Sequence, residues 1–236
     1  MSHRYFVTGT DTEIGKTTIA AGLLHAARRR GLSTAAVKPI AAGCLRSAEG
    51  LRNDDALTLQ AECAPSLDYD LLNPVALEPP IAPHIAAREA GLQLTAAQLA
   101  DDCRRVFARG ADLTLVEGAG GWRVPLNGEQ TLAALAIELK LPVILVVGLR
   151  LGCINHALLT AEAIAADGLR LAGWVANQVD PHMERQQSNL DSLRALMKAP
   201  LLGVVPRLDP LSAAGVADHL ELDSLLGATG GLSGLR

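Results

Sequence analysis

Six short apolar runs recur along the chain, and longer segments with helical patterning separate them. The runs occupy residues 5–8, 34–37, 113–116, 143–147, 171–176 and 201–205. Most of them are continuously apolar, which is typical of strands that are covered on both faces of a sheet. Segments of helical length lie between them, at residues 17–30, 95–109, 131–139, 155–166 and 183–197. This alternation predicts an α/β fold with a mainly parallel, doubly wound sheet and helices on both faces.

We expect one domain over residues 1–226, followed by a flexible, glycine-rich tail over residues 227–236. One segment has no clear period. Residues 63–88 are rich in proline, which predicts a long ordered loop. Loops of this length in compact domains often carry function.

Composition narrows the classes of partner. The 236 residues are 49% hydrophobic, which is enough to build a sizeable core. Lys plus Arg (21) against Asp plus Glu (25) gives a net charge of -4, which disfavours nucleic acid and anionic membranes as partners. No apolar run reaches the roughly 18 residues of a membrane span, and the first residues lead straight into a strand. We therefore expect a cytoplasmic protein that acts on small molecules.

The four cysteines are far apart and form no CxxC pair; they are Cys44, Cys63, Cys103 and Cys153. Their spacing from the histidines does not suit zinc either. Reduced thiols are the expectation.

A phosphate-binding loop follows the first apolar run. The residues GTDTEIGKTT, from Gly9 to Thr18, lie between a predicted strand and a predicted helix. Glycines let backbone N–H groups turn toward phosphate oxygens, and the helix that begins near Lys16 adds its positive end. Lys16 is expected to reach the terminal phosphates and the Thr17 hydroxyl to hold Mg²⁺. The loop is longer than the common pattern by one residue, because five residues separate Gly9 from Gly15.

Two acidic residues lie in this loop. Asp11 and Glu13 are unfavourable beside an anion unless they meet a cation or a substrate amine. The sequence therefore predicts a positively charged group close to the phosphates, and ammonium groups of a substrate are one candidate.

Further charged residues follow apolar runs and should reach the same edge of the sheet. Lys38 ends the second run, and a second lysine there suits the charge that builds on a transferring phosphoryl group. Asp54 and Asp55 open a helical stretch, so we expect one to cap the helix and the other to be a ligand. Glu117 follows the third run before a glycine turn, the position of a carboxylate that holds Mg²⁺. A solvated lysine and a structural glutamate are the plain alternatives.

Six segments in order resemble signatures of the dethiobiotin synthetase family, over about residues 5–206. They are GTDTEIGKTT, VKPIAAG, RNDDAL, VEGAGGW, LGCINHALLT and GWVANQV. The resemblance implies a P-loop NTPase fold and a cytoplasmic homodimer. It also implies a ligase of biotin synthesis that uses ATP and Mg²⁺ to join CO₂ or bicarbonate to 7,8-diaminopelargonic acid. A carbamate and a carbamic–phosphoric anhydride would precede ring closure to dethiobiotin, with release of ADP and phosphate.

The same resemblance assigns the site. The metal ligands would be Thr17, Asp55 and Glu117, and the catalytic residues Lys38, Lys16 and Thr12. Nucleotide contacts would come from Glu13, Ile14, Gly15, Lys16, Thr17, Thr18, Asp55, Glu117, Gly118, Ala119, Gly120, Asn177, Gln178, Pro206, Arg207 and Leu208. Asn177 would read the adenine base, and Pro206, Arg207 and Leu208 would line its pocket.

The diamine would contact Thr12 and Lys38. From the partner subunit, the helix N-terminus at Gly152, Cys153, Ile154 and Asn155 would meet its distant carboxylate, because such a terminus suits an anion. Ala42 stands where the family commonly has a serine, so Gly43 or a water would have to replace that hydroxyl contact.

Other classes fit less well. A regulatory ATPase of the partitioning or septum-positioning kind would need a second lysine early in the loop, where this chain has Thr10. An amidotransferase-type synthetase would need a further glutaminase stretch with a cysteine–histidine pair. A purely structural nucleotide-binding module would leave Lys38 without a role.

Overall fold

Six parallel strands form the central sheet of the protein, in the order β10-β9-β8-β1-β7-β2. The structure is a computed structural model, and it describes residues 2–227. The strands are β1 (His3–Gly9), β2 (Thr34–Val37), β7 (Leu113–Gly121), β8 (Val143–Gly148), β9 (Leu171–Asn177) and β10 (Leu201–Val205). Each predicted run is one of these strands, so the parallel, doubly wound sheet is confirmed.

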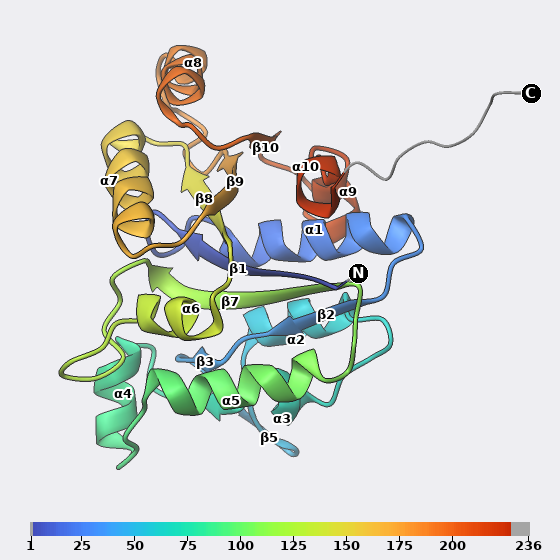
Figure 1. Cartoon of the computed structure of the whole chain (residues 1–236), viewed down its shortest axis with the longest axis vertical. Helices are drawn as coiled ribbons and strands as arrows, with labels where there is room; N and C mark the ends of the chain where they lie inside the picture. Colours follow the sequence, from blue (N-terminus) through green and yellow to red (C-terminus); the bar gives the residue numbers. More distant parts are fainter. Residues whose placement is uncertain (1, 228–236) are drawn as a thin grey trace, which may run out of the picture.

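Helices cover both faces of the sheet. The longer ones are α1 (Lys16–Arg29), α2 (Asp54–Ala61), α5 (Ala96–Phe107), α6 (Ala133–Leu139), α7 (Cys153–Ala166) and α8 (Gln186–Leu196). In Figure 1, α1 lies on one side of the sheet with two short helices, α9 (Ala213–Ala217) and α10 (Asp223–Leu226), and α5 lies on the other. The opposite sides of α1 and α5 follow from right-handed crossovers, because the chain moves in opposite directions across the sheet before and after β2.

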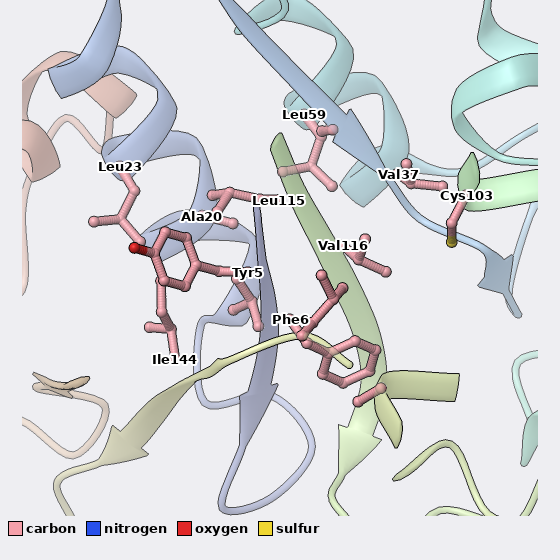
Figure 2. Packing of buried hydrophobic residues seen from close by; sticks show 14 of the residues in the cluster. Tyr5, Phe6, Ala20, Leu23, Val37, Leu59, Cys103, Leu115, Val116 and Ile144 are labelled. Atoms are coloured by element: carbon pink, nitrogen blue, oxygen red, sulfur yellow. The ribbon is translucent and has the colours of Figure 1, made fainter. Parts of the chain in front are cut away.

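The core alternates along the central strands. Figure 2 shows the Tyr5 and Leu115 side chains directed toward Leu23 of α1, whereas Phe6 and Val116 point to the opposite face. All five are at most 4% exposed. Covering both faces of β1 and β7 in this way holds their carboxyl ends at one edge of the sheet, where ligands bind in such folds.

The segment at residues 63–88 is not the long ordered loop that its prolines predicted. It contains α3 (Tyr69–Leu72), strand β6 (Val75–Ala76) and α4 (Pro83–Glu89), and β6 pairs in parallel with β3 (Ile40–Ala41). These elements are too short to show a period, and proline is compatible with the first turn of α4. A hairpin of β4 (Leu45–Ser47) and β5 (Gly50–Arg52) was likewise unpredicted.

The strand β7 runs further than predicted. It continues through Glu117 to Gly121, because its pairing with β1 resumes at Gly9 and Gly121 after a register shift. Glu117 is therefore inside the strand, opposite Val7, and not in a turn that follows it.

All four cysteines are buried and unpaired. Within residues 2–227 no helix is long and apolar enough to cross a membrane. The predicted tail lies outside the described residues except for Gly227.

Candidate functional site

The phosphate loop joins β1 to α1 at the carboxyl edge of the sheet. Its backbone enters the left-handed region twice, at Glu13 (φ 56°) and at Gly15 (φ 82°), the residue that caps α1. A Cβ atom on Gly15 would lie 2.3 Å from Nδ2 of Asn177, so both conformation and space require glycine. The helix begins at Lys16, as predicted, and directs its free N–H groups toward the loop.

Lys16 is buried beside this loop, with 7% of its surface exposed. Its Nζ donates a hydrogen bond to the main-chain oxygen of Asp11 at 3.0 Å. Burial lowers the pKa of Lys16 to about 8. The negative charge of Glu117 opposes this shift, and the positive charge of Lys38 adds to it. Because its charge is costly in this position, Lys16 gains strongly from a nearby anion such as a phosphate oxygen.

Lys38 lies between two carboxylates. Its Nζ donates to Oδ2 of Asp55 at 2.8 Å and to Oε1 of Glu117. The Thr17 hydroxyl donates to the same glutamate oxygen at 2.8 Å. The Lys38 side chain is 5% exposed, that of Glu117 is 0% exposed, and that of Asp55 is half exposed. Four residues that the sequence selected in four separate segments therefore meet at one point.

The cluster stabilises charge on its members. Burial disfavours the ammonium of Lys38, but the attraction of Glu117 and Asp55 outweighs it and raises the pKa of Lys38. Burial also disfavours the ionised form of Asp55, and its contacts with Lys38 and Thr17 outweigh this and lower the pKa of Asp55. Among the described atoms, Oε2 of Glu117 is buried without a hydrogen-bond partner, which leaves it available to a further ligand.

Asn53 places Asp55 in the cluster. Its side chain accepts a hydrogen bond from the N–H of Ala56 at 3.2 Å and caps α2. The prediction that Asp54 or Asp55 would cap this helix is therefore wrong, because asparagine one residue earlier takes that role and moves both aspartates into the first turn. Asp55 remains the one that reaches Lys38.

A buried polar network from the proline-rich segment supports the cluster. The Tyr69 hydroxyl accepts from the N–H of Asn53 at 2.7 Å and donates to Oδ1 of Asn73 at 3.0 Å. Nδ2 of Asn73 in turn donates to the main-chain oxygen of Lys38 at 2.7 Å. Sequence reasoning did not identify Tyr69 and Asn73 as positioning residues. Only the expectation that this segment carries function pointed toward them.

A cavity of about 830 Å³ opens above the loop and the cluster. Ten of the predicted site residues line it, namely Thr12, Glu13, Gly15, Lys16, Thr17, Thr18, Lys38, Asp55, Ala119 and Gly120. Ala42 also lines it, without a hydroxyl. Residues 80–83, from the segment expected to be a loop, also line it. The chain therefore brings the phosphate loop, both lysines and Asp55 to one hollow.

Three predicted residues support this cavity from behind. Glu117 lies beneath it, in contact with Lys38 and Thr17. Ile14 is 1% exposed and belongs to the core, and its main-chain oxygen accepts a hydrogen bond from Nδ2 of Asn177 at 2.9 Å. Gly118 packs against the ring of Phe6, where a Cβ atom would approach within 3.0 Å.

The residues expected around adenine lie at or just after the carboxyl ends of β9 and β10, which pair with each other. Asn177 ends β9, and the N–H of Gln178 donates to the oxygen of Val205, the last residue of β10, at 2.9 Å. Residues 206–208 follow directly. This group lies at the same carboxyl edge but does not line the cavity, and its contact with the loop is the bond from Asn177.

The residues expected to meet the diamine's carboxylate open α7. The helix starts at Cys153, two residues earlier than predicted, and Gly152 caps it at φ 94°. Cys153 is buried and Asn155 is exposed. None of residues 152–155 lines the cavity of this chain.

The fold and site define a P-loop nucleotide-binding protein: a glycine-bearing loop between a strand and a helix, a buried lysine, and a carboxylate on the adjacent strand. Two solved structures share the fold. A ParA family ATPase from Chlorobium tepidum TLS superposes with a TM-score of 0.54 at 15% identity, over 92% of this chain and 91% of that one. The MinD cell division protein of Aquifex aeolicus gives 0.54 at 16% identity, over 94% and 88%.

Closer relatives refine the class. A family model described as an AAA domain matches residues 3–215. An ATP-dependent dethiobiotin synthetase BioD of Pseudomonas aeruginosa (strain UCBPP-PA14) is 64% identical over 94% of this chain and 97% of its own length. One of the same name from Cellvibrio japonicus is 59% identical over 95% and 98%. The chain belongs to the dethiobiotin synthetase family of ATP-dependent ligases, which confirms the resemblance of its sequence motifs.

Proposed function

We propose that the protein joins CO₂ to 7,8-diaminopelargonic acid at the expense of ATP and closes the ring of dethiobiotin, in biotin synthesis. The observation that carries the proposal is the convergence of Lys16, Lys38 and Asp55 on one cavity at the phosphate loop, with Glu117 in contact with Lys38 beneath it. A relative at 64% identity, with nearly full coverage, bears the name of this activity.

The reaction explains why the site needs two lysines. One amine adds CO₂ to give a carbamate, and a carbamate oxygen then attacks the γ-phosphorus of ATP and displaces ADP. The second amine attacks the carbonyl carbon of the resulting anhydride, phosphate leaves, and the ring closes. Negative charge moves onto phosphoryl and carbamate oxygens in these steps, and the buried lysines Lys16 and Lys38 would stabilise it. Holding both nitrogens in line could supply up to about 7–11 kcal/mol.

The site also fits Mg²⁺. Thr17, Asp55 and Glu117 present the hard oxygen donors that Mg²⁺ prefers, and Oε2 of Glu117 is a buried acceptor without a partner among the described atoms. No group of three or more His, Cys, Asp and Glu side chains gathers in the described part of the chain, so phosphate oxygens and waters would complete the coordination. Bound there, Mg²⁺ would neutralise charge on the β- and γ-phosphates.

Lys38 and a metal compete for the same oxygens. Its ammonium already contacts both Asp55 and Glu117, so a divalent cation between them requires Lys38 to give up at least one contact. Released from Glu117, the lysine could turn to the carbamate and the transferring phosphoryl group. We therefore expect Lys38→Met to lower kcat strongly while MgATP still binds.

The remaining proposed contacts are those to the base and to the partner subunit. We infer that Asn177, Gln178 and residues 206–208 hold the base, since they lie at the carboxyl ends of β9 and β10. We infer a homodimer in which the N-terminus of α7 meets the carboxylate of the diamine bound to the partner, and Leu151, 91% exposed beside it, fits an interface. A cytoplasmic location, without nucleic acid or membrane partners, accords with the net charge of -4.

Mass spectrometry of the products tests the proposal. Purified protein with diaminopelargonate, bicarbonate and MgATP should form dethiobiotin, and ATP turnover should require both the diamine and bicarbonate. Turnover at an equal rate without the diamine would instead indicate a regulatory ATPase, the fold of which is shared. Size measurement of the same sample tests the dimer separately.

A further inference from the structure

Asp11 is an acidic residue built into an anion-binding loop. Its Oδ1 accepts a hydrogen bond from the N–H of Thr12 at 2.8 Å, and its main-chain oxygen holds Nζ of Lys16 at 3.0 Å. The side chain is thus fixed beside the lysine that serves the phosphates. Counted by side chains, residues 9–18 carry two negative charges, from Asp11 and Glu13, and one positive charge, from Lys16. A loop with this net negative charge repels a polyphosphate.

Arg150 supplies the cation that the sequence analysis expected here. Its guanidinium forms an ion pair with Oδ2 of Asp11, so both oxygens of that carboxylate are engaged. The two loops meet because β8 and β1 are neighbouring strands, and the N–H of Thr10 donates to Val146 at 3.0 Å. Sequence reasoning missed Arg150, since it is 139 residues away and belongs to no phosphate-binding motif.

The backbone holds Arg150 at this position from both sides. The N–H of Leu149 donates to the oxygen of Asn177 at 2.7 Å, and the oxygen of Arg150 accepts from the N–H of Cys153 at 3.0 Å. The side chains of Arg150 and Asp11 are 42% and 44% exposed. Such a half-exposed pair adds little to folding stability, so its placement against the phosphate loop calls for another explanation.

We propose that Arg150 is a positioning residue of the nucleotide site, which acts by neutralising Asp11. With Arg150 in place the loop region is balanced in charge, and Lys16 and the N-terminus of α1 can attract phosphate groups without opposition from that carboxylate. The benefit grows with each phosphate of the ligand. This inference rests on the proposed function only in that the loop binds ATP.

A double-mutant cycle tests the proposal. Calorimetric affinities for MgATP, MgADP and AMP are measured with the wild type, Arg150→Met, Asp11→Asn and the double variant, at low and at physiological salt. Arg150→Met should lower the affinity for MgATP about five- to tenfold at low salt, lower the affinity for MgADP less, and leave that for AMP almost unchanged. Asp11→Asn should bind MgATP at least as tightly as the wild type. The double variant should return to within about twofold of it.

Arg104→Met is the matched control. Arg104 has a similar exposure and pairs with Glu138 on the surface, outside the cavity, so its loss should leave all three affinities unchanged. Weakening of all three ligands by one factor would assign Arg150 a general structural role and overturn the proposal. A double variant that binds MgATP as weakly as Arg150→Met would also overturn the proposal, because it would show that Arg150 contacts the phosphates directly. Failure of the wild type to bind MgATP would instead reject the proposed function itself.

Discussion

Removal of the Lys38 ammonium should lower the free energy of unfolding, because it leaves the buried carboxylate of Glu117 without its main partner. In Lys38→Met, the carboxylate of Glu117, 0% exposed, keeps only the Thr17 hydroxyl at 2.8 Å. Breaking a buried ion pair from one side costs about 3–5 kcal/mol. The second contact, with half-exposed Asp55, adds little. For a chain of this size, about 3 kcal/mol corresponds to a fall of roughly 6–12 °C in Tm.

Urea denaturation followed by circular dichroism measures this loss. Mg²⁺ should stabilise Lys38→Met more than the wild type, because a second cation takes the place of the ammonium.

The double variant Lys38→Met/Glu117→Gln is the internal control. With both charges removed, the free energy of unfolding should return to within about 1 kcal/mol of the wild type. If Lys38→Met unfolds at the same urea concentration as the wild type, or if the double variant is no more stable than the single one, Lys38 does not compensate the buried charge of Glu117 and the prediction is wrong.

Three further outcomes are expected. Because Lys16 of the free protein has a pKa of about 8 and must be charged to bind phosphate, the affinity for MgATP should be constant below about pH 7 and fall above about pH 8 by up to tenfold per pH unit. Calorimetry in two buffers should detect proton uptake on binding at high pH. Binding without proton uptake would contradict this prediction. Gly15→Ala should lose MgATP binding and about 1–3 kcal/mol of stability, since φ is 82° and Asn177 blocks the Cβ; unchanged binding would mean that the loop is not held as described. Asn53→Ala should lower the free energy of unfolding by about 1 kcal/mol and weaken Mn²⁺ binding. Asp54→Asn, next to Asn53 but outside the cluster, should leave Mn²⁺ affinity unchanged.

Much of the fold and site could be predicted because their signals are local. Continuous apolar runs predicted all six strands of the central sheet, and the loop between a strand and a helix predicted the start of α1 at Lys16. Short elements such as α3 and β6 were missed, since two to four residues carry no measurable period.

The sequence on its own carried the parallel sheet, the phosphate loop, and the identity of the two lysines and two acids, because apolar periodicity and motif spacing are properties of short stretches of chain. Only folding could show that Lys38 lies between Asp55 and Glu117 and that Asp11 pairs with Arg150. Those relations join segments up to 139 residues apart, and they arise from strand order and side-chain packing, which no local pattern encodes.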